Sequence, residues 1–170
     1  MIRAIEEHDR GRLAAFVREH WGAPVLVAHG IVYEVARLPA FVAVEDDEWV
    51  GCISYIIKDG DCEIVSLDSL REGRGIGSAL IKAVKEVAER AGCRRLWLIT
   101  TNDNLHALRF YQKRGFALMA IHRGAVDLAR HLKPEIPLIG NDGIPLRDEI
   151  ELEMDLQAGD RAPGEIGRKG

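Results

Sequence analysis

The chain has 170 residues, and its apolar content of 47% is enough to fill one hydrophobic core of ordinary size. Its formal net charge of -4 at pH 7 argues against a nucleic-acid partner, because such proteins normally present a basic surface. No stretch approaches the roughly 20 apolar residues that cross a bilayer, so we expect no membrane partner.

The first part of the chain is predicted to be helical over residues 5–20, because the apolar residues fall at helical spacings. The sequence Trp21-Gly22-Ala23-Pro24 then breaks this pattern. Residues 25–38 are compatible with a strand or with a second helix, and Pro39 closes the segment. The choice between strand and helix stays open for this stretch.

Three short strands are predicted next, over residues 40–45, 49–57 and 62–70. An acidic turn joins the first two strands, and a turn that contains Asp59-Gly60 joins the second and third. An Asp-Gly pair is a strong hairpin signal. The segment is therefore predicted to be an antiparallel meander whose last strand leads into a glycine-rich loop.

The glycine-rich loop has the sequence Arg71-Glu72-Gly73-Arg74-Gly75-Ile76-Gly77-Ser78. Glycines at alternate positions allow a tight turn in which successive backbone N–H groups face one hollow. The apolar periodicity of residues 79–91 predicts that a helix follows, which adds unpaired N–H groups and the positive end of its dipole. We therefore expect the loop to bind a phosphate or pyrophosphate group.

Gly92 ends that helix, and residues 96–101 are predicted to form a strand. A strand, loop, helix and strand in succession form a crossover unit, so the two strands are expected to be parallel. The sequence then predicts a helix over residues 105–114, capped by the preceding Asn-Asp-Asn, and a strand over residues 116–122.

A helical piece is predicted over residues 125–132, followed by a loop rich in Pro and Gly. Residues 149–156 alternate between acidic and apolar side chains, which predicts a strand with one buried face and one acidic face in water. Such a strand is a candidate sheet edge, so a monomer or a homodimer is expected. We assign residues 1–157 to a single domain and residues 158–170 to a mobile tail.

The familiar nucleotide-binding loops fit this sequence poorly. A dinucleotide fingerprint requires a glycine three residues after Gly75, where Ser78 stands. A nucleoside triphosphate loop requires Gly-Lys followed by Ser or Thr, and the sequence contains no such triplet. A turn with a structural role only, or a site for another phosphate ligand, remains open at this point.

Two segments together resemble the GNAT superfamily of acyl-coenzyme A-dependent N-acetyltransferases. The family's phosphate loop has Gln or Arg, two variable residues, Gly, a variable residue, and Gly or Ala; Gly75 and Gly77 match its two small positions. Its second motif is matched, in order, by Asn104, Ala107, Phe110, Tyr111, Gly115 and Phe116. The sequence departs from the family at Glu72, although Arg71 and Arg74 flank this residue and can offset its charge.

The resemblance implies an α/β fold in which a central mixed sheet, built from the meander and the crossover unit, is flanked by helices. It also implies that acetyl-CoA is the co-substrate. The pyrophosphate would lie on the amides of the loop, and the pantetheine arm would pair with the preceding strand. The implied coenzyme-binding residues are Leu67, Asp68, Ser69, Leu70, Glu72, Gly73, Arg74, Gly75, Ile76, Gly77, Ser78, Asn104, Ala107 and Tyr111.

Acetyl transfer to an amine requires a base, a donor for the developing oxyanion and often a proton for the departing thiolate. The resemblance implies that Tyr111 is the general acid and Glu63 the base. A role for Tyr111 in the core, an exposed position for Glu63, and a relay of waters as the base remain alternatives. The backbone N–H of Leu67 or Asp68 is the candidate oxyanion donor, and transfer is expected to be direct, without an acyl-enzyme.

The acceptor is expected between the N-terminal helices and the later loops, with His20, Trp21, Tyr33 and residues 123–147 as candidate walls. The histidines lack metal-ligand spacing, so no metal is expected. The unpaired cysteines and the lack of an apolar leader in the first 18 residues predict a reduced, cytoplasmic protein. The alternative functions are a non-catalytic acyl-CoA-binding or regulatory module of the same fold, and a protein that binds another phosphate ligand.

Overall fold

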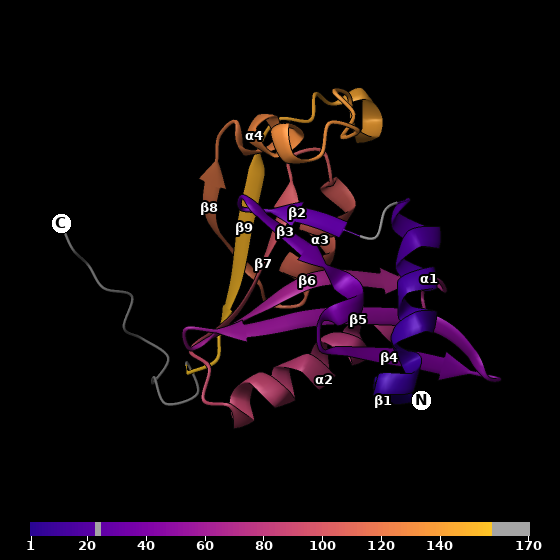
Figure 1. Cartoon of the computed structure of the whole chain (residues 1–170). Helices are drawn as coiled ribbons and strands as arrows, with labels where there is room; N and C mark the ends of the chain where they lie inside the picture. The colour runs from indigo at the N-terminus through magenta and orange to yellow at the C-terminus, as the bar shows by residue number, and fades with distance from the viewer. Residues whose placement is uncertain (23–24, 158–170) are drawn as a thin grey trace.

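The computed structural model describes residues 1–22 and 25–157, and Figure 1 shows their arrangement. The predicted tail at residues 158–170, and Ala23 and Pro24 of the predicted break, lie outside the described residues. The centre is a seven-stranded mixed sheet with the order β1-β4-β5-β6-β7-β9-β8. Its strands are β1 (Ile2–Ala4), β4 (Ala40–Glu45), β5 (Glu48–Lys58), β6 (Asp61–Ser69), β7 (Arg95–Thr101), β8 (Ala117–His122) and β9 (Glu149–Asp155).

Helices cover both faces of this sheet (Figure 1). The helices are α1 (Arg10–Trp21), α2 (Ile76–Arg90), α3 (Leu105–Lys113) and α4 (Ala125–Leu132), with 3-10 turns at Glu7–Asp9, Val35–Arg37 and Asn141–Gly143. The apolar side of α2 packs on one face through Leu80 and Val84, which join a core with Leu96 of β7. On the other face, Leu13 and Phe16 of α1 form a second core. The predicted mixed sheet flanked by helices is confirmed.

The meander and the crossover unit are as predicted. The turn residues Asp46 and Asp47, and likewise Asp59 and Gly60, have positive φ values of 49° to 79°, which twist the chain correctly for a two-residue hairpin. Strands β4, β5 and β6 pair antiparallel, and β6 pairs with β7 in parallel, as a crossover through α2 requires.

The open question about residues 25–38 is resolved in favour of strands. They form a hairpin of β2 (Val25–Ala28) and β3 (Ile31–Glu34), joined at His29 and Gly30, followed by the 3-10 turn. Both linking residues have positive φ, 39° and 77°, as a tight two-residue hairpin requires. The hairpin lies across the same face of the sheet as α1, over β6, β7 and β9 (Figure 1).

Strand β6 contains an irregularity that shapes the centre of the molecule. Opposite it on β5, Ser54 pairs with Ser66 and Tyr55 pairs with Ile64, so Val65 is an extra residue that forms a bulge. On the other side, the ladder between β6 and β7 contains three pairs within the described residues, and it ends at Ile64 and Leu98. Beyond these residues the two parallel strands separate and leave a gap in the sheet.

Two expectations for the last strand are wrong. Strand β9 is not a sheet edge, because it pairs with both β7 and β8. Its acidic face is in water only at the far end: Glu149 and Glu151 are 4% and 9% exposed, whereas Asp155 is exposed. The His29 N–H of the hairpin donates a hydrogen bond to the Glu149 carboxylate, and Arg95 of β7 pairs with Glu151 at 2.7 Å. The alternation was read correctly as a strand, but the acidic face is neutralised by partners from other elements.

Candidate active site

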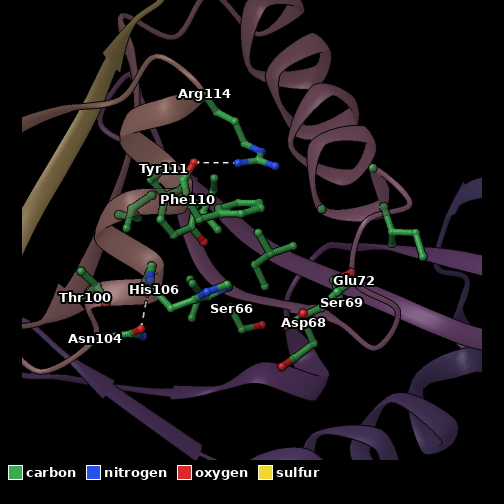
Figure 2. Close-up of a pocket in the computed structure, with 18 of the residues that line it drawn as sticks. Ser66, Asp68, Ser69, Glu72, Thr100, Asn104, His106, Phe110, Tyr111 and Arg114 are labelled. Atoms are coloured by element: carbon green, nitrogen blue, oxygen red, sulfur yellow. Dashed lines mark hydrogen bonds between the residues drawn. The ribbon is translucent and has the colours of Figure 1, made fainter. Parts of the chain in front are cut away.

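A cavity of about 720 Å³ opens where β6 and β7 separate. Its walls are the end of β6 from Ile64, residues 98–100 of β7, the glycine-rich loop with the first turn of α2, and one side of α3 (Figure 2). This volume lies in the usual range for a small-molecule or cofactor site. Most of the predicted coenzyme-binding residues line it, including Leu67, Asp68, Ser69, Glu72, Gly73, Gly75, Ile76, Gly77, Asn104, Ala107 and Tyr111.

The glycines of the loop have different roles. Gly73 and Gly75 have φ values of 74° and 70°, a left-handed conformation in which other residues are strained. Gly75 is also the N-cap of α2, and no side chain caps the helix there. Gly77 lies inside the helix, where a Cβ atom would come within 2.8 Å of Phe110 Cζ. Contrary to the expectation that all three glycines serve the turn, Gly77 allows α2 and α3 to approach closely.

The first turn of α2 is a ready anion site. The Ala79 N–H donates to Gly75 O, and the N–H groups before it lie ahead of the first helical hydrogen bond. Beside them, Arg114 of α3 donates from Nε to Ser78 Oγ at 2.8 Å, and its guanidinium lies 3.5 Å from the centroid of the Phe110 ring. Figure 2 shows Arg114 reaching from α3 toward this end of the cavity.

The two arginines of the loop do not offset Glu72, contrary to expectation. Arg71 and Arg74 both donate to the Glu45 carboxylate at the end of β4, at 2.5 and 2.9 Å. Glu72 itself is exposed and lines the cavity. Arg71 also lines the cavity, so backbone N–H groups, Arg114 and Arg71 are the donors available at this end of the cavity.

Tyr111 belongs both to the core and to the cavity wall. Its ring packs edge-on against Phe110 and Phe116, with centroids 5.1 and 5.4 Å away, and the residue is 8% exposed. Burial raises the pKa of the Tyr111 phenol, and the negative charge of Asp68 adds to this effect. The phenol therefore stays protonated at neutral pH and has a proton to donate.

Asn104 performs the capping role that the sequence predicted. Its Oδ1 accepts a hydrogen bond from the Ala107 N–H at 3.1 Å, which starts helix α3. Asn104 and Ala107 also line the cavity. The cap therefore fixes the end of α3 that faces the space between β6 and β7.

On the opposite wall of the cavity, Asp68 receives a hydrogen bond from the Trp21 indole, Nε1 to Oδ2, at 2.8 Å. Burial raises the pKa of the Asp68 carboxyl, and the indole N–H partly opposes this shift. Figure 2 shows Asp68 and Ser66 across the cavity from Tyr111. Helix α1 thus contributes to the cavity through its last residue.

Glu63 is buried, so the exposed position considered for it is wrong. It is 4% exposed and lies on the face covered by the β2–β3 hairpin. Its Oε1 is 2.9 Å from His29 Nε2, and its Oε2 accepts a hydrogen bond from the Tyr33 hydroxyl at 2.9 Å. Glu63 pairs with Trp97 in the sheet, one step before β6 and β7 separate. It does not line the cavity but adjoins Ile64, where the cavity begins.

The expected acceptor walls are only partly brought together. Trp21 lies in the cavity and Tyr33 contacts Glu63, whereas His20 packs on Phe16, with ring centroids 4.2 Å apart. From the segment 123–147, Lys133 donates to Val25 O of the hairpin at 3.2 Å, which ties the two regions to each other.

The sequence reading missed two residues that the structure brings to this region. His29 was not singled out; the available signal was a two-residue His-Gly link between two apolar four-residue runs. Arg114 was not among the predicted site residues either, and its contact with Ser78 depends on the close approach of α2 and α3. The described residues contain no group of three or more metal-ligating side chains placed to hold a metal ion. Nor do they contain a helix with the length and apolar character for a membrane crossing.

Comparison with known proteins places this architecture in a family. The uncharacterized protein YdhI of Bacillus subtilis (strain 168) is 49% identical over 139 residues, which are 81% of this chain and 87% of that protein. The spermine/spermidine N(1)-acetyltransferase of the same strain is 37% identical over 51 residues, 29% of this chain and 34% of that enzyme.

Among solved structures, a GNAT family acetyltransferase from Elizabethkingia anophelis with acetyl-CoA bound shares the fold. Its TM-score is 0.64 at 23% identity, with 91% of this chain and 97% of the other covered. The sequence model of the acetyltransferase (GNAT) family matches residues 5–116, well over half of the chain. The chain therefore belongs to the GNAT acetyltransferase family.

Proposed function

We propose that this protein transfers an acetyl group from acetyl-CoA directly to a primary amine of a small molecule or peptide. The observation that carries this proposal is the cavity between β6 and β7, which has the N-terminus of α2 at one end and Tyr111 and Asp68 on facing walls. The acetyl-CoA bound to the structurally similar Elizabethkingia enzyme supports the choice of donor. The spermine/spermidine enzyme supports an amine as the acceptor.

The coenzyme would lie along the gap in the sheet. Its pyrophosphate would accept hydrogen bonds from the loop and from the first N–H groups of α2, beside Arg114. Its pantetheine arm would then pair with β6 in the place that β7 vacates beyond Ile64. Asn104 and Ala107 would flank the arm.

The strand geometry favours Leu67 over Asp68 as the oxyanion donor. The Leu70 N–H donates to Val50 O of β5. Because successive N–H groups of a strand point alternately to its two neighbours, that of Asp68 also faces β5 and that of Leu67 faces the gap. We therefore assign the thioester carbonyl to the Leu67 N–H.

In the reaction, the neutral amine nitrogen attacks the thioester carbon and forms the new C–N bond. The C–S bond then breaks, the thiolate takes a proton from the Tyr111 phenol, and the proton that the acylated nitrogen gives up restores the phenol. Glu63 receives the proton that the ammonium group loses before attack, through a water because it lies just outside the cavity. No acyl-enzyme is formed.

Release of free coenzyme A thiol from acetyl-CoA across a panel of amines tests this function. The panel comprises spermidine, spermine, simple primary amines and peptides with free N-termini, and calorimetry measures acetyl-CoA binding separately. We expect binding together with thiol release that depends on one class of amine. Tight binding of acetyl-CoA without thiol release on the panel would favour the non-catalytic module. Binding of another nucleotide, but not of acetyl-CoA, would refute acetyl-CoA as the donor.

Replacement of Tyr111 by Phe is expected to lower turnover by about 10- to 100-fold. The affinity for acetyl-CoA is expected to stay the same, because the ring still packs between Phe110 and Phe116 while only the hydroxyl is lost. Steady-state rates at saturating acetyl-CoA and amine measure the effect, and thermal unfolding checks the core. An unchanged rate would remove Tyr111 from the mechanism.

A further inference from the structure

The tip of the β2–β3 hairpin holds the Glu63 carboxylate from two sides. His29 Nε2 lies 2.9 Å from Oε1, the Tyr33 hydroxyl donates to Oε2 at 2.9 Å, and His29 Nε2 and the Tyr33 hydroxyl are 3.0 Å apart. An ionised carboxylate only accepts hydrogen bonds. His29 Nε2 therefore carries a proton, and two donors point at the carboxylate at once.

The imidazole of His29 is itself fixed in place. The His29 backbone N–H donates to the Glu149 carboxylate at 3.2 Å, and its ring lies 5.1 Å, centroid to centroid, from that of Trp97 on β7. The side chain of Glu63 is 5% exposed and that of His29 is 26% exposed. Tyr33 is buried, at 7% exposure. Within this group His29 is therefore the side chain that meets solvent.

The place of this contact in the fold gives it a consequence for the reaction. Glu63 precedes Ile64, and Ile64 is both the last β6 residue paired with β7 and the first that lines the cavity. A carboxylate held at this point cannot rotate freely toward or away from the separating strands. Precise placement of a base is a large part of its effect on rate.

We propose that His29 and Tyr33 are positioning residues for acetyl transfer, which hold and orient the Glu63 carboxylate at the narrow end of the cavity. The inference rests on the proposed function, in which Glu63 is the base. It adds that the hairpin, an element outside the cavity, sets the strength and direction of that base.

The surrounding charges define the expected pH behaviour. The hydrogen bond that His29 donates to Glu63 raises the pKa of His29, burial opposes this increase, and the charges of Glu63, Glu149 and Glu151 add to it. The cations nearby are otherwise engaged: Arg95 pairs with Glu151, Glu153 and Asp61, and His122 pairs with Glu151. The protonation of His29 is then expected to influence the acid limb of the rate profile.

The experiment compares His29→Gln, His29→Ala and Tyr33→Phe with the unchanged protein. The acceptor is the amine with the fastest turnover in the panel above, and the rates are measured across the neutral pH range. His122→Gln is the matched control, because His122 contacts a buried glutamate of the same face, Glu151, but does not contact Glu63.

We expect His29→Ala to lower kcat by about tenfold and to change the pH profile, because the Glu63 carboxylate loses one of the two donors that orient it and the titrating imidazole is gone. His29→Gln is expected to restore part of the rate, since its amide can donate. Tyr33→Phe is expected to lower kcat less, and the KM for acetyl-CoA stays unchanged in all three. If His29→Ala and Tyr33→Phe match His122→Gln in kcat and pH profile while Glu63→Gln is impaired, the positioning role is refuted and the base assignment survives.

A second measurement does not depend on an acceptor. The titration of His29, followed by NMR in the acetyl-CoA complex, is expected to show a pKa that falls toward the ordinary histidine value in Glu63→Gln. A His29 pKa that is the same in both proteins would overturn the coupling, even if the amine panel had given no turnover and the proposed function had failed.

Discussion

Replacement of Glu63 by Gln is expected to lower turnover by about 10²- to 10⁴-fold, the range for loss of a positioned general base. Gln keeps the size of the side chain and can still accept a hydrogen bond from the Tyr33 hydroxyl, but it cannot take a proton from an ammonium group. Acetyl-CoA affinity is expected to be unchanged, because Glu63 does not line the cavity. Single-turnover rates with a saturating amine measure the effect on the chemical step.

The matched control is Glu151→Gln, which removes another buried carboxylate from the same face of the sheet. Glu151 pairs with Arg95 and His122 on β7 and β8, so its loss is expected to cost stability but little turnover. Comparison of the two variants separates an effect on the chemical step from an effect on stability. Turnover of Glu63→Gln at more than about a tenth of the normal rate would show that water alone, without Glu63, accepts the proton of the ammonium group.

Replacement of Gly77 by Val is expected to weaken acetyl-CoA binding by about tenfold or more, which corresponds to about 1.4 kcal/mol. The first added carbon already meets the Phe110 ring at 2.8 Å, so this ring or the whole of α3 must move away from the start of α2. That movement also displaces Arg114, whose guanidinium lies on the Phe110 ring beside Ser78. The free energy of unfolding is expected to fall by about 1–3 kcal/mol from overpacking.

Gly11→Val provides the control for this change. Gly11 also lies in a helix, α1, but an added Cβ atom there meets nothing within 4 Å. Its stability is expected to stay within about 0.5 kcal/mol of the original, with no change in acetyl-CoA affinity. Calorimetry and urea unfolding of both variants make the comparison. Equal acetyl-CoA affinity and equal stability of the two variants would show that the contact between α2 and α3 does not shape the cavity.

The parts of the fold that the sequence predicted depend on local signals. The Asp59-Gly60 turn, the periodic helix after the glycine-rich loop and the alternation of the last strand all encode their conformation within a few residues. The loop and the motif around Tyr111 were joined into one site by their resemblance to the GNAT family. Asn104 was predicted as a cap for the same local reason.

The parts that were missed depend on contacts between distant segments. Nothing near Glu149 or Glu151 indicates that a hairpin more than 100 residues earlier, and Arg95, will cover the acidic face of β9. Residues 25–38 lack strong turn residues apart from Gly30, so their periodicity left strand and helix equally open. The burial of Glu63 followed from the same hairpin and could not be read from β6 alone.

The bulge at Val65 decides which carboxylates can act together. Glu63 and Asp68 are five positions apart, and in a regular strand an odd separation places two side chains on opposite faces. The extra residue restores them to one face, where Glu63 meets the hairpin and Asp68 meets Trp21 of α1. Leu67, between them, packs into the core beneath α2. One strand thus presents two acids to the same side of the sheet, one on each side of the point where β6 and β7 part.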